Sequence, residues 1–232
     1  MFTVALIGPD GAGKTTIARR LEHTYPRQVK YFYMGVNADA SNIMLPTTRL
    51  IHAIKRTLGA EPDIAGPRDP SRVRPRPKGA VKRVIVGLRS GLRLVNWLGD
   101  EWFRQVVAWT YQRRGRIVVF DRHFFPDYYA YDIANDSHER SLSQRIHGFV
   151  LNRVYPKPDL MIYFDAPAEV LIARKGEGTL ELLECRRQQY LQLRELLRNF
   201  VTVDATQPED EVARNVAELI WGFKKARTGN SD

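Results

Sequence analysis

A nine-residue stretch near the start of the chain, GPDGAGKTT, most constrains what this sequence can fold into. It follows the apolar run FTVALI and fills the spacing G-x-x-x-x-G-K-[ST] with Gly8, Gly13, Lys14 and Thr15. Glycines let the backbone turn tightly, so that successive N–H groups can reach phosphate oxygens. The lysine can place a positive charge on the β and γ phosphates, and the threonine hydroxyl can ligate Mg²⁺. The order of strand, loop and helix favours a nucleotide-binding loop over a glycine-rich turn with a chance lysine.

The segment after this loop, TTIARRLEHTY, predicts a helix whose positive N-terminal end faces the same anion. We therefore expect ATP, with Mg²⁺, to bind along the loop. The residues expected to contact it are Gly8, Asp10, Gly11, Ala12, Gly13, Lys14, Thr15 and Thr16.

Five apolar runs predict strands: FTVALIG (2–8), VKYFYMG (29–35), RIVVFD (116–121), DLMIYFD (159–165) and FVTVD (200–204). Their apolar residues are nearly continuous, as is typical of buried parallel strands. Helical patterns separate the runs, at 14–25, within 79–113, around 138–154, at 180–199 and at 209–226. This alternation predicts an α/β fold with a doubly wound parallel sheet, and nucleotide bound at the carboxyl ends of the strands.

The length of 232 residues predicts one domain over residues 1–226, followed by a frayed tail at 227–232. The single cysteine, Cys185, cannot form an intrachain disulfide and excludes a cysteine-based metal site. No stretch approaches the ~20 apolar residues that span a bilayer, and the apolar start is too short for a signal peptide. We therefore expect a cytoplasmic protein.

Residues 60–79 interrupt the strand and helix alternation with a segment rich in proline and arginine, which predicts a loop. The long helical pattern after it is amphipathic and carries basic residues between its apolar positions. One interpretation is a helix that covers the sheet. The alternative is a basic surface at 60–95 for an anionic membrane or nucleic acid, which the net charge of +10 also allows.

The third apolar run ends in Asp121, Arg122 and His123. An acid at the end of a strand beside a phosphate loop is the expected second residue near Mg²⁺, so Thr15 and Asp121 are the candidate metal site. Arg122 can form paired hydrogen bonds with a phosphate of a second substrate. The alternative is that Asp121 caps a helix and Arg122 pairs with it at the surface. For His123 a structural role is favoured over a catalytic one.

A lid is predicted over residues 174–187, within LIARKGEGTLELLECRRQQY. Phosphoryl transfer spreads negative charge over the transferred oxygens, and a basic lid can stabilise that charge while excluding water. The candidates are Arg174 with Arg187 or Arg186, and two glycines would let the segment move. The alternative is a solvated helix whose arginines pair with Glu181 and Glu184.

Together these motifs resemble the thymidylate kinases, a family of P-loop nucleoside monophosphate kinases with a five-stranded parallel sheet. The resemblance covers about residues 1–35 and 110–222 and rests on GPDGAGKTT, DRH, PDLMIYFDAPAEV, RRQQYLQL and VDATQPEDEVARNV. It implies ATP as donor, Asp10 facing the acceptor's sugar, and Arg122 on the acceptor phosphate. Arg174 and Arg187 would stabilise the transferred group, and Thr206 and Gln207 would lie along adenine. Because Gly11 stands where some members carry an arginine, the catalytic arginine would come from the lid.

The departures from the family fall where the acceptor should bind. The second strand is followed by YMGVNADASN rather than R-E-P-G, and Asp100 stands where an arginine should bind the monophosphate. Arg93 or Arg104 would have to supply that contact. The basic insertion before the third strand is foreign to the compact family.

The sequence therefore predicts a phosphotransferase that moves the γ-phosphoryl of MgATP to a small acceptor. A nucleoside monophosphate such as dTMP is one acceptor, and a sugar or other metabolite is the other. A homodimer is also compatible with the pattern. The hypothesis from another class is an ATP-switched interaction protein that uses the basic region at 60–95.

Overall fold

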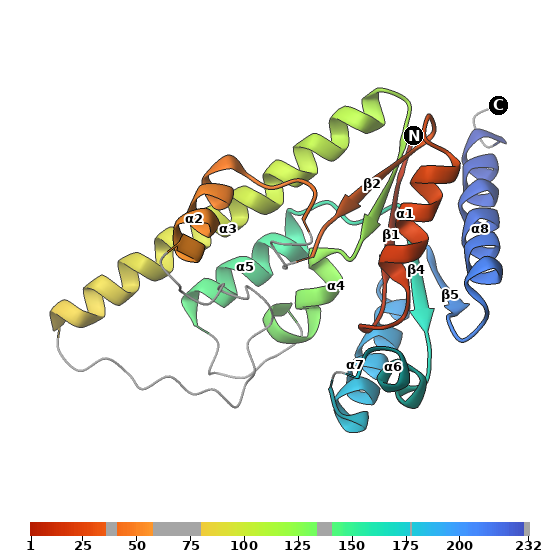
Figure 1. Ribbon diagram of the computed structural model, residues 1–232. Helices are drawn as coiled ribbons and strands as arrows, with labels where there is room; N and C mark the ends of the chain where they lie inside the picture. The colour runs from red at the N-terminus through yellow and green to blue at the C-terminus, as the bar shows by residue number, and fades with distance from the viewer. Residues whose placement is uncertain (36–40, 58–79, 134–140, 177, 230–232) are drawn as a thin grey trace.

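The computed structural model describes residues 1–35, 41–57, 80–133, 141–176 and 178–229 (Figure 1). Its centre is a five-stranded, all-parallel sheet with the strand order β2-β3-β1-β4-β5. The strands are β1 (Thr3–Ile7), β2 (Val29–Tyr33), β3 (Ile117–Asp121), β4 (Leu160–Asp165) and β5 (Phe200–Asp204). All five predicted strands are confirmed to within two residues at either end, and the α/β fold with them.

The order places β1 at the centre, between β3 and β4. Leu6 of β1 is in register with Asp121, the last residue of β3, and Ile7 is in register with Tyr163 of β4. The loop that follows β1 therefore leaves the sheet at the edge where β3 and β4 also end. This is where a doubly wound sheet binds its ligands.

Helices cover both faces of the sheet (Figure 1). One buried cluster joins it to α1 (Lys14–Thr24), α6 (Ala168–Lys175) and α8 (Glu209–Gly229). The other joins it to α3 (Ala80–Arg113), α4 (Phe124–Tyr128) and α5 (Leu142–Arg153). The remaining helices are α2 (Pro46–Thr57), the π-helix η1 (Tyr129–Ile133), α7 (Leu180–Gln192) and the short η2 (Leu193–Glu195).

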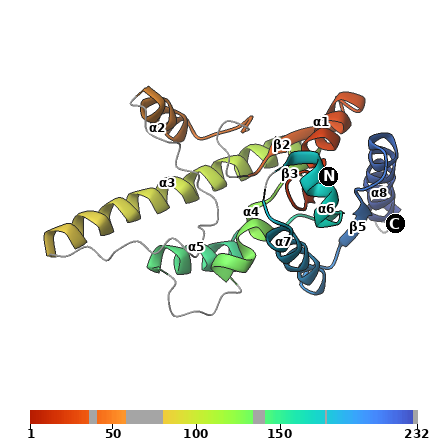
Figure 2. The same cartoon turned by 60° about the horizontal axis from the view of Figure 1, so that its bottom comes forward.

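Helix α3 only partly covers the sheet, which corrects one interpretation of its pattern. Its 34 residues make it about 50 Å long, and its first half extends beyond the sheet (Figures 1 and 2). Leu88, Leu92 and Val95 are between 63% and 69% exposed, whereas Leu94 is buried. Helical spacing alone could not show this, because an apolar stripe has the same period whether or not it is covered.

The structure also tests the predicted helices and the predicted ends of the chain's segments. Three helices, α2, α4 and α6, were not predicted from the sequence; they have 12, 5 and 8 residues. Helix α8 continues to Gly229, so residues 227–229 are helical rather than frayed. The proline- and arginine-rich segment at 60–79 and residues 230–232 lie outside the described residues. Among the described helices, none is long and apolar enough to cross a membrane.

Candidate functional site

The phosphate loop has the backbone conformation that its glycines predict. Gly8 has φ +142°, and a Cβ added there would lie 2.7 Å from the carbonyl oxygen of Phe164 on β4. Gly13 has φ +86° and immediately precedes α1, which begins at Lys14. No side-chain hydrogen bond caps this end of α1. The backbone N–H groups of its first turn are therefore suited to a phosphate group.

Lys14 is the buried cation of this loop, with a residual exposure of 5%. Its Nζ donates a hydrogen bond to the carbonyl oxygen of Pro9 at 2.6 Å. Burial and the nearby charge of Arg122 together lower the pKa of Lys14 to about 8, against the opposing effects of Asp10 and Asp121. A bound phosphate would favour the charged form of this lysine.

Asp121 joins the end of β3 to the phosphate loop. The Thr15 hydroxyl donates to Asp121 Oδ2 at 2.6 Å, and the Tyr31 hydroxyl donates to the same oxygen at 3.4 Å. Asp121 is fully buried, and its Oδ1 has no hydrogen-bond partner among the described residues. A hydroxyl beside a carboxylate with an unused oxygen is the donor set that Mg²⁺ prefers. The pair therefore fits the predicted metal site, in which phosphate oxygens would complete the coordination.

Arg122 follows in the left-handed backbone conformation, with φ 68°, which is uncommon for a residue other than glycine. This turn directs its side chain toward the phosphate loop, where it forms an ion pair with Asp10. Burial opposes the charge of Arg122, but the carboxylates of Asp127 and Asp10 outweigh that effect and raise its pKa above the ordinary value. The alternative prediction was a surface ion pair between Asp121 and Arg122. Among the described residues, Arg122 pairs with Asp10 and not with Asp121.

Two comparisons bear on this arrangement. The thymidylate kinase family model matches residues 102–216, a range that contains Asp121, Arg122 and the predicted lid. The chain is also similar to the probable thymidylate kinase 1 of Saccharolobus solfataricus, with 25% identity over 223 residues that cover 94% of this chain and 95% of that protein. These matches support a thymidylate kinase-like family for this chain. They indicate a kinase, and they suggest an ATP-dependent nucleotide monophosphate kinase.

The arginines that the thymidylate kinase resemblance placed over the γ-phosphate are held elsewhere in this structure. Arg174 donates to the carbonyl oxygens of Ala205 at 2.7 Å and Thr206 at 3.5 Å. Arg187 donates from Nε and Nη2 to the two carboxylate oxygens of Asp165, at 2.6 and 2.9 Å. Their predicted catalytic roles stay predictions, because each would require its guanidinium to leave these partners.

Two other cations of this kinase lie nearer the phosphate loop. Lys175 Nζ is 4.0 Å from Asp10 Oδ1. Burial opposes ionisation of Asp10, but Arg122, Lys14, Lys175 and Arg186 together lower its pKa below the ordinary value. Arg186 was the alternative to Arg187 among the predicted lid arginines, and its charge contributes to the lowered pKa of Asp10.

The two cations predicted for the acceptor, Arg93 and Arg104, lie apart on α3. Arg104 is buried, forms an ion pair with Asp100 at 2.5 Å and donates to the carbonyl oxygens of Tyr33 at 3.3 Å and Gly35 at 2.9 Å. It therefore fastens the end of β2 to α3. Arg93 is exposed and lies eleven residues earlier on the same helix, a separation of about 16 Å along the axis. Gly35, which binds Arg104, also lies against the Arg122 side chain, so the acceptor role of Arg104 stays a prediction, as does that of Arg93.

Asp127 is the functional candidate that the sequence analysis missed. It lies in α4, where it is part-exposed between the buried Pro126 and Tyr128. Its Oδ1 accepts a hydrogen bond from the Tyr190 hydroxyl of α7 at 3.2 Å. Burial raises the pKa of Asp127, although Arg122 and Lys14 act in the opposite direction. The available signal was a lone acid in the apolar run FFPDYY.

His123 has the structural role that was favoured for it. It is fully buried, and its Nδ1 accepts a hydrogen bond from the backbone N–H of Phe125, so that it caps the start of α4. Burial lowers its pKa to about 3, so the ring is neutral at physiological pH.

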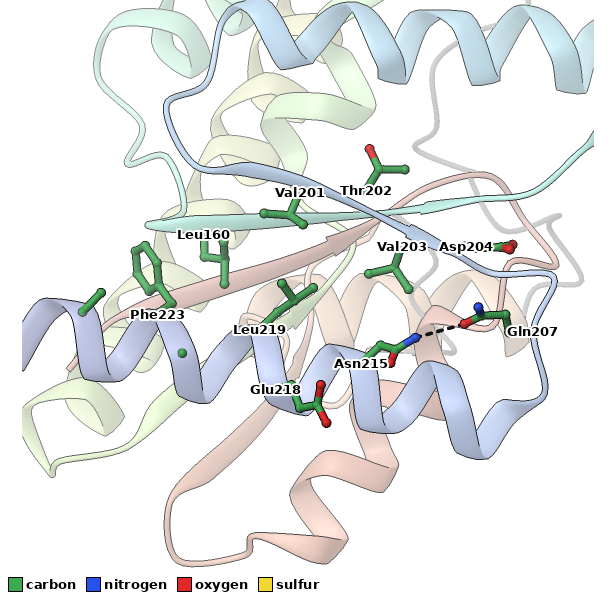
Figure 3. Close-up of a pocket in the computed structure, with 12 residues that line it drawn as sticks. Leu160, Val201, Thr202, Val203, Asp204, Gln207, Asn215, Glu218, Leu219 and Phe223 are labelled. Atoms are coloured by element: carbon green, nitrogen blue, oxygen red, sulfur yellow. Dashed lines mark hydrogen bonds between the residues drawn. The ribbon is translucent and has the colours of Figure 1, made fainter.

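The segment expected along adenine forms a turn between β5 and α8. The Thr206 backbone N–H and hydroxyl both donate to Asp204 Oδ1, at 2.8 and 2.6 Å, and Asn215 Nδ2 donates to Gln207 Oε1 at 3.0 Å. A groove runs from this turn along β5 and α8 toward Leu160, at the start of β4 (Figure 3). It leads away from the carboxyl edge of the sheet and is separate from the phosphate loop.

Proposed function

We propose that this kinase transfers the γ-phosphoryl group of MgATP to a small acceptor held between the phosphate loop and Arg122. One observation carries the proposal: two contacts, Thr15 with Asp121 and Asp10 with Arg122, join the loop to the end of β3. The groups proposed for the donor and for the acceptor would therefore lie next to one another. Positioning and electrostatic stabilisation are the main tasks of a protein in phosphoryl transfer.

On the donor side, the amides of residues 8–16 would bind the phosphates, and Lys14 would place its charge on the β and γ groups. Thr15 and Asp121 would hold Mg²⁺, which when bound neutralises charge on the phosphates. Thr206 and Gln207 would lie along adenine. Lid cations would then stabilise the transferred group, drawn from Arg174, Arg187, Arg186 and Lys175.

Two acceptor classes fit this crevice. A nucleoside monophosphate, with dTMP the first to test, is supported by the family and by the name of the relative. An acceptor that offers a hydroxyl group, such as a sugar, is supported by the contacts around Arg122. Arg122 is paired with Asp10, and Arg104 is paired with Asp100, so each of these guanidinium groups already has a carboxylate partner.

The test is ADP formation with MgATP and each acceptor in turn, with the product identified by mass. The acceptors are dTMP, the other nucleoside monophosphates, thymidine and a set of neutral monosaccharides. The proposal predicts ADP together with a phosphorylated acceptor from one of these classes, and loss of both in Lys14→Ala. Binding of MgATP without any phosphoryl transfer would argue against a kinase, and a Lys14→Ala variant with wild-type turnover would contradict the assigned donor site.

A further inference from the structure

The buried guanidinium of Arg104 joins two segments that lie next to Arg122. Its Nη1 donates to the carbonyl oxygens of Tyr33 at 3.3 Å and of Gly35 at 2.9 Å, at the end of β2. Its Cζ lies 5.5 Å from the centroid of the Phe124 ring, at the start of α4. Arg122 stands in the chain between β3 and that helix. One cation of α3 therefore contacts both the end of β2 and the beginning of α4.

Gly35 brings the end of β2 into contact with Arg122. A Cβ added to Gly35 would lie 2.5 Å from Arg122 Cδ and 2.5 Å from the Tyr33 hydroxyl oxygen, so a glycine leaves room for both side chains. This segment is also tied to β3, because the Met34 backbone N–H donates to the carbonyl oxygen of the last β3 residue at 2.9 Å. The aliphatic part of the Arg122 side chain therefore packs against a backbone segment whose carbonyl groups Arg104 holds.

Asp100 fixes the direction of the Arg104 side chain. The two residues pair one turn apart on α3, with Arg104 Nη2 2.5 Å from Asp100 Oδ2, and both are buried. Asp100 Oδ1 accepts a second hydrogen bond, from the Leu45 backbone N–H at 2.7 Å. The donors of a guanidinium group lie in a rigid plane, so a partner at Nη2 also determines where Nη1 points. The ion pair therefore directs Nη1 at the carbonyl groups beside Arg122.

We propose that Arg104 is a positioning residue, which fixes the Arg122 guanidinium for the acceptor through the end of β2. The inference rests on the proposed function, in which Arg122 acts on the acceptor. Asp10 holds the tip of Arg122 by an ion pair, whereas Gly35 limits the path of its aliphatic part. Misplacing a group that meets a reactant by about 1 Å can lower a rate by about a hundredfold. A fixed end of β2 is therefore expected to matter for phosphoryl transfer.

Two variants and a control separate this role from a structural one. Asp100→Asn/Arg104→Met removes both charges of the buried pair, and asparagine can still accept from the Leu45 backbone N–H. Arg104→Lys keeps a charge beside Asp100 but lacks the planar donors, and it takes the place of the double variant if that protein does not fold. Arg89→Met changes an exposed arginine of the same helix and is the control. Each change is made in the wild type and in Arg122→Gln, and thermal unfolding checks that every protein folds.

A positioning residue predicts a loss of activity that depends on Arg122. With the acceptor that the wild type phosphorylates, the double variant should lower kcat/KM by at least about tenfold, while MgATP affinity stays within about threefold. In the Arg122→Gln background the same change should lower single-turnover kcat/KM by no more than about threefold.

Two kinetic results would overturn the inference. An equal loss in both backgrounds would mean that Arg104 contacts the acceptor itself, for which its buried Nε has no other partner among the described residues. An unchanged kcat/KM in a double variant that unfolds at a lower temperature would mean that the ion pair only stabilises the fold.

Nuclear magnetic resonance of the arginine Nε–H groups gives a readout that needs no turnover. The Arg122 signal is assigned by its loss in Arg122→Gln, and it should shift and broaden in the double variant but stay unchanged in Arg89→Met. An Arg122 signal that the double variant leaves unchanged would also overturn the inference. A wild type that binds MgATP and phosphorylates no acceptor would instead refute the proposed function, and the spectra would still decide whether Arg104 fixes Arg122.

Discussion

His147 of α5 joins this helix to η1 and α3, and it provides a sharp test of how these three elements are held together. The ring is fully buried, with Nδ1 2.7 Å from Asp132 Oδ2 of η1 and Nε2 3.0 Å from Glu101 Oε1 of α3. It also stacks on Trp97, with 3.9 Å between ring centroids. Burial disfavours the charged ring, but the hydrogen bonds to both carboxylates outweigh it and raise the pKa of His147 to about 9.

The raised pKa predicts that stability falls as the pH rises. The folded protein holds this proton up to about pH 9, whereas an unfolded histidine releases it near 6.5. The contribution of His147 is therefore complete below pH 6.5 and lost by about pH 9, and the shift corresponds to about 3 kcal/mol. Glu101 acts in the same direction, because burial raises its pKa too. Lys14 has the opposite effect on stability above about pH 8. Its pKa is lowered in the folded protein, so the folded state binds fewer protons than the unfolded state in that range.

The assay is urea unfolding of the wild type and of His147→Gln at intervals from pH 6 to pH 9.5. The wild type is expected to lose up to about 3 kcal/mol of unfolding free energy relative to the variant across this range. The difference between the two proteins cancels the contribution of Lys14, which both retain. A difference that stays constant with pH would refute the assignment of a buried, doubly hydrogen-bonded imidazolium. Folding of the variant is checked by its circular dichroism.

Two further predictions concern the kinetics of the site. Arg186→Gln should lower kcat by about tenfold or more, because the charge of Arg186 acts on the phosphate loop. Arg187→Gln should mainly destabilise the lid, because it removes the partner of Asp165. Steady-state kinetics and thermal unfolding compare the two variants, and a larger loss of kcat in Arg187→Gln would reverse the assignment. Gly35→Ala would place a Cβ 2.5 Å from Arg122 Cδ and so displace the arginine. The kcat/KM for the acceptor should fall by about tenfold, while the MgATP affinity measured by calorimetry stays unchanged. Unaltered acceptor kinetics would contradict a role for this close approach.

The strands and the phosphate loop were predictable from the sequence because local composition determines them. A nearly continuous apolar run can only be a buried strand or buried helix, and the five runs here are too short for helices. The motif beginning at Gly8 depends on backbone conformations that glycine alone adopts readily, so its spacing carries its geometry. Asp121 was predictable for a similar reason, since the last residue of a central strand must lie at the carboxyl edge.

The directions of long side chains were not predictable, because distant residues decide them. Arg187 is bound by Asp165 on another element, and Arg104 is bound by carbonyl oxygens that follow β2. Arg174 likewise contacts a turn some thirty residues away in sequence. Asp127 was not predicted because a lone acid in an apolar run has no periodicity, and its hydrogen bond from Tyr190 joins residues 63 positions apart.

The central claim is that the phosphate loop binds the donor, while Arg122, which contacts the loop at Asp10, acts on the acceptor. Calorimetric MgATP affinity and single-turnover transfer rates, measured on Lys14→Ala and Arg122→Gln, test it most directly. Lys14→Ala should lose MgATP affinity by about a hundredfold, whereas Arg122→Gln should bind MgATP within about threefold of wild type and transfer its phosphoryl group about a thousandfold more slowly. If Arg122→Gln instead lost MgATP affinity and kept the transfer rate of the bound nucleotide, the division between the two sides would be wrong.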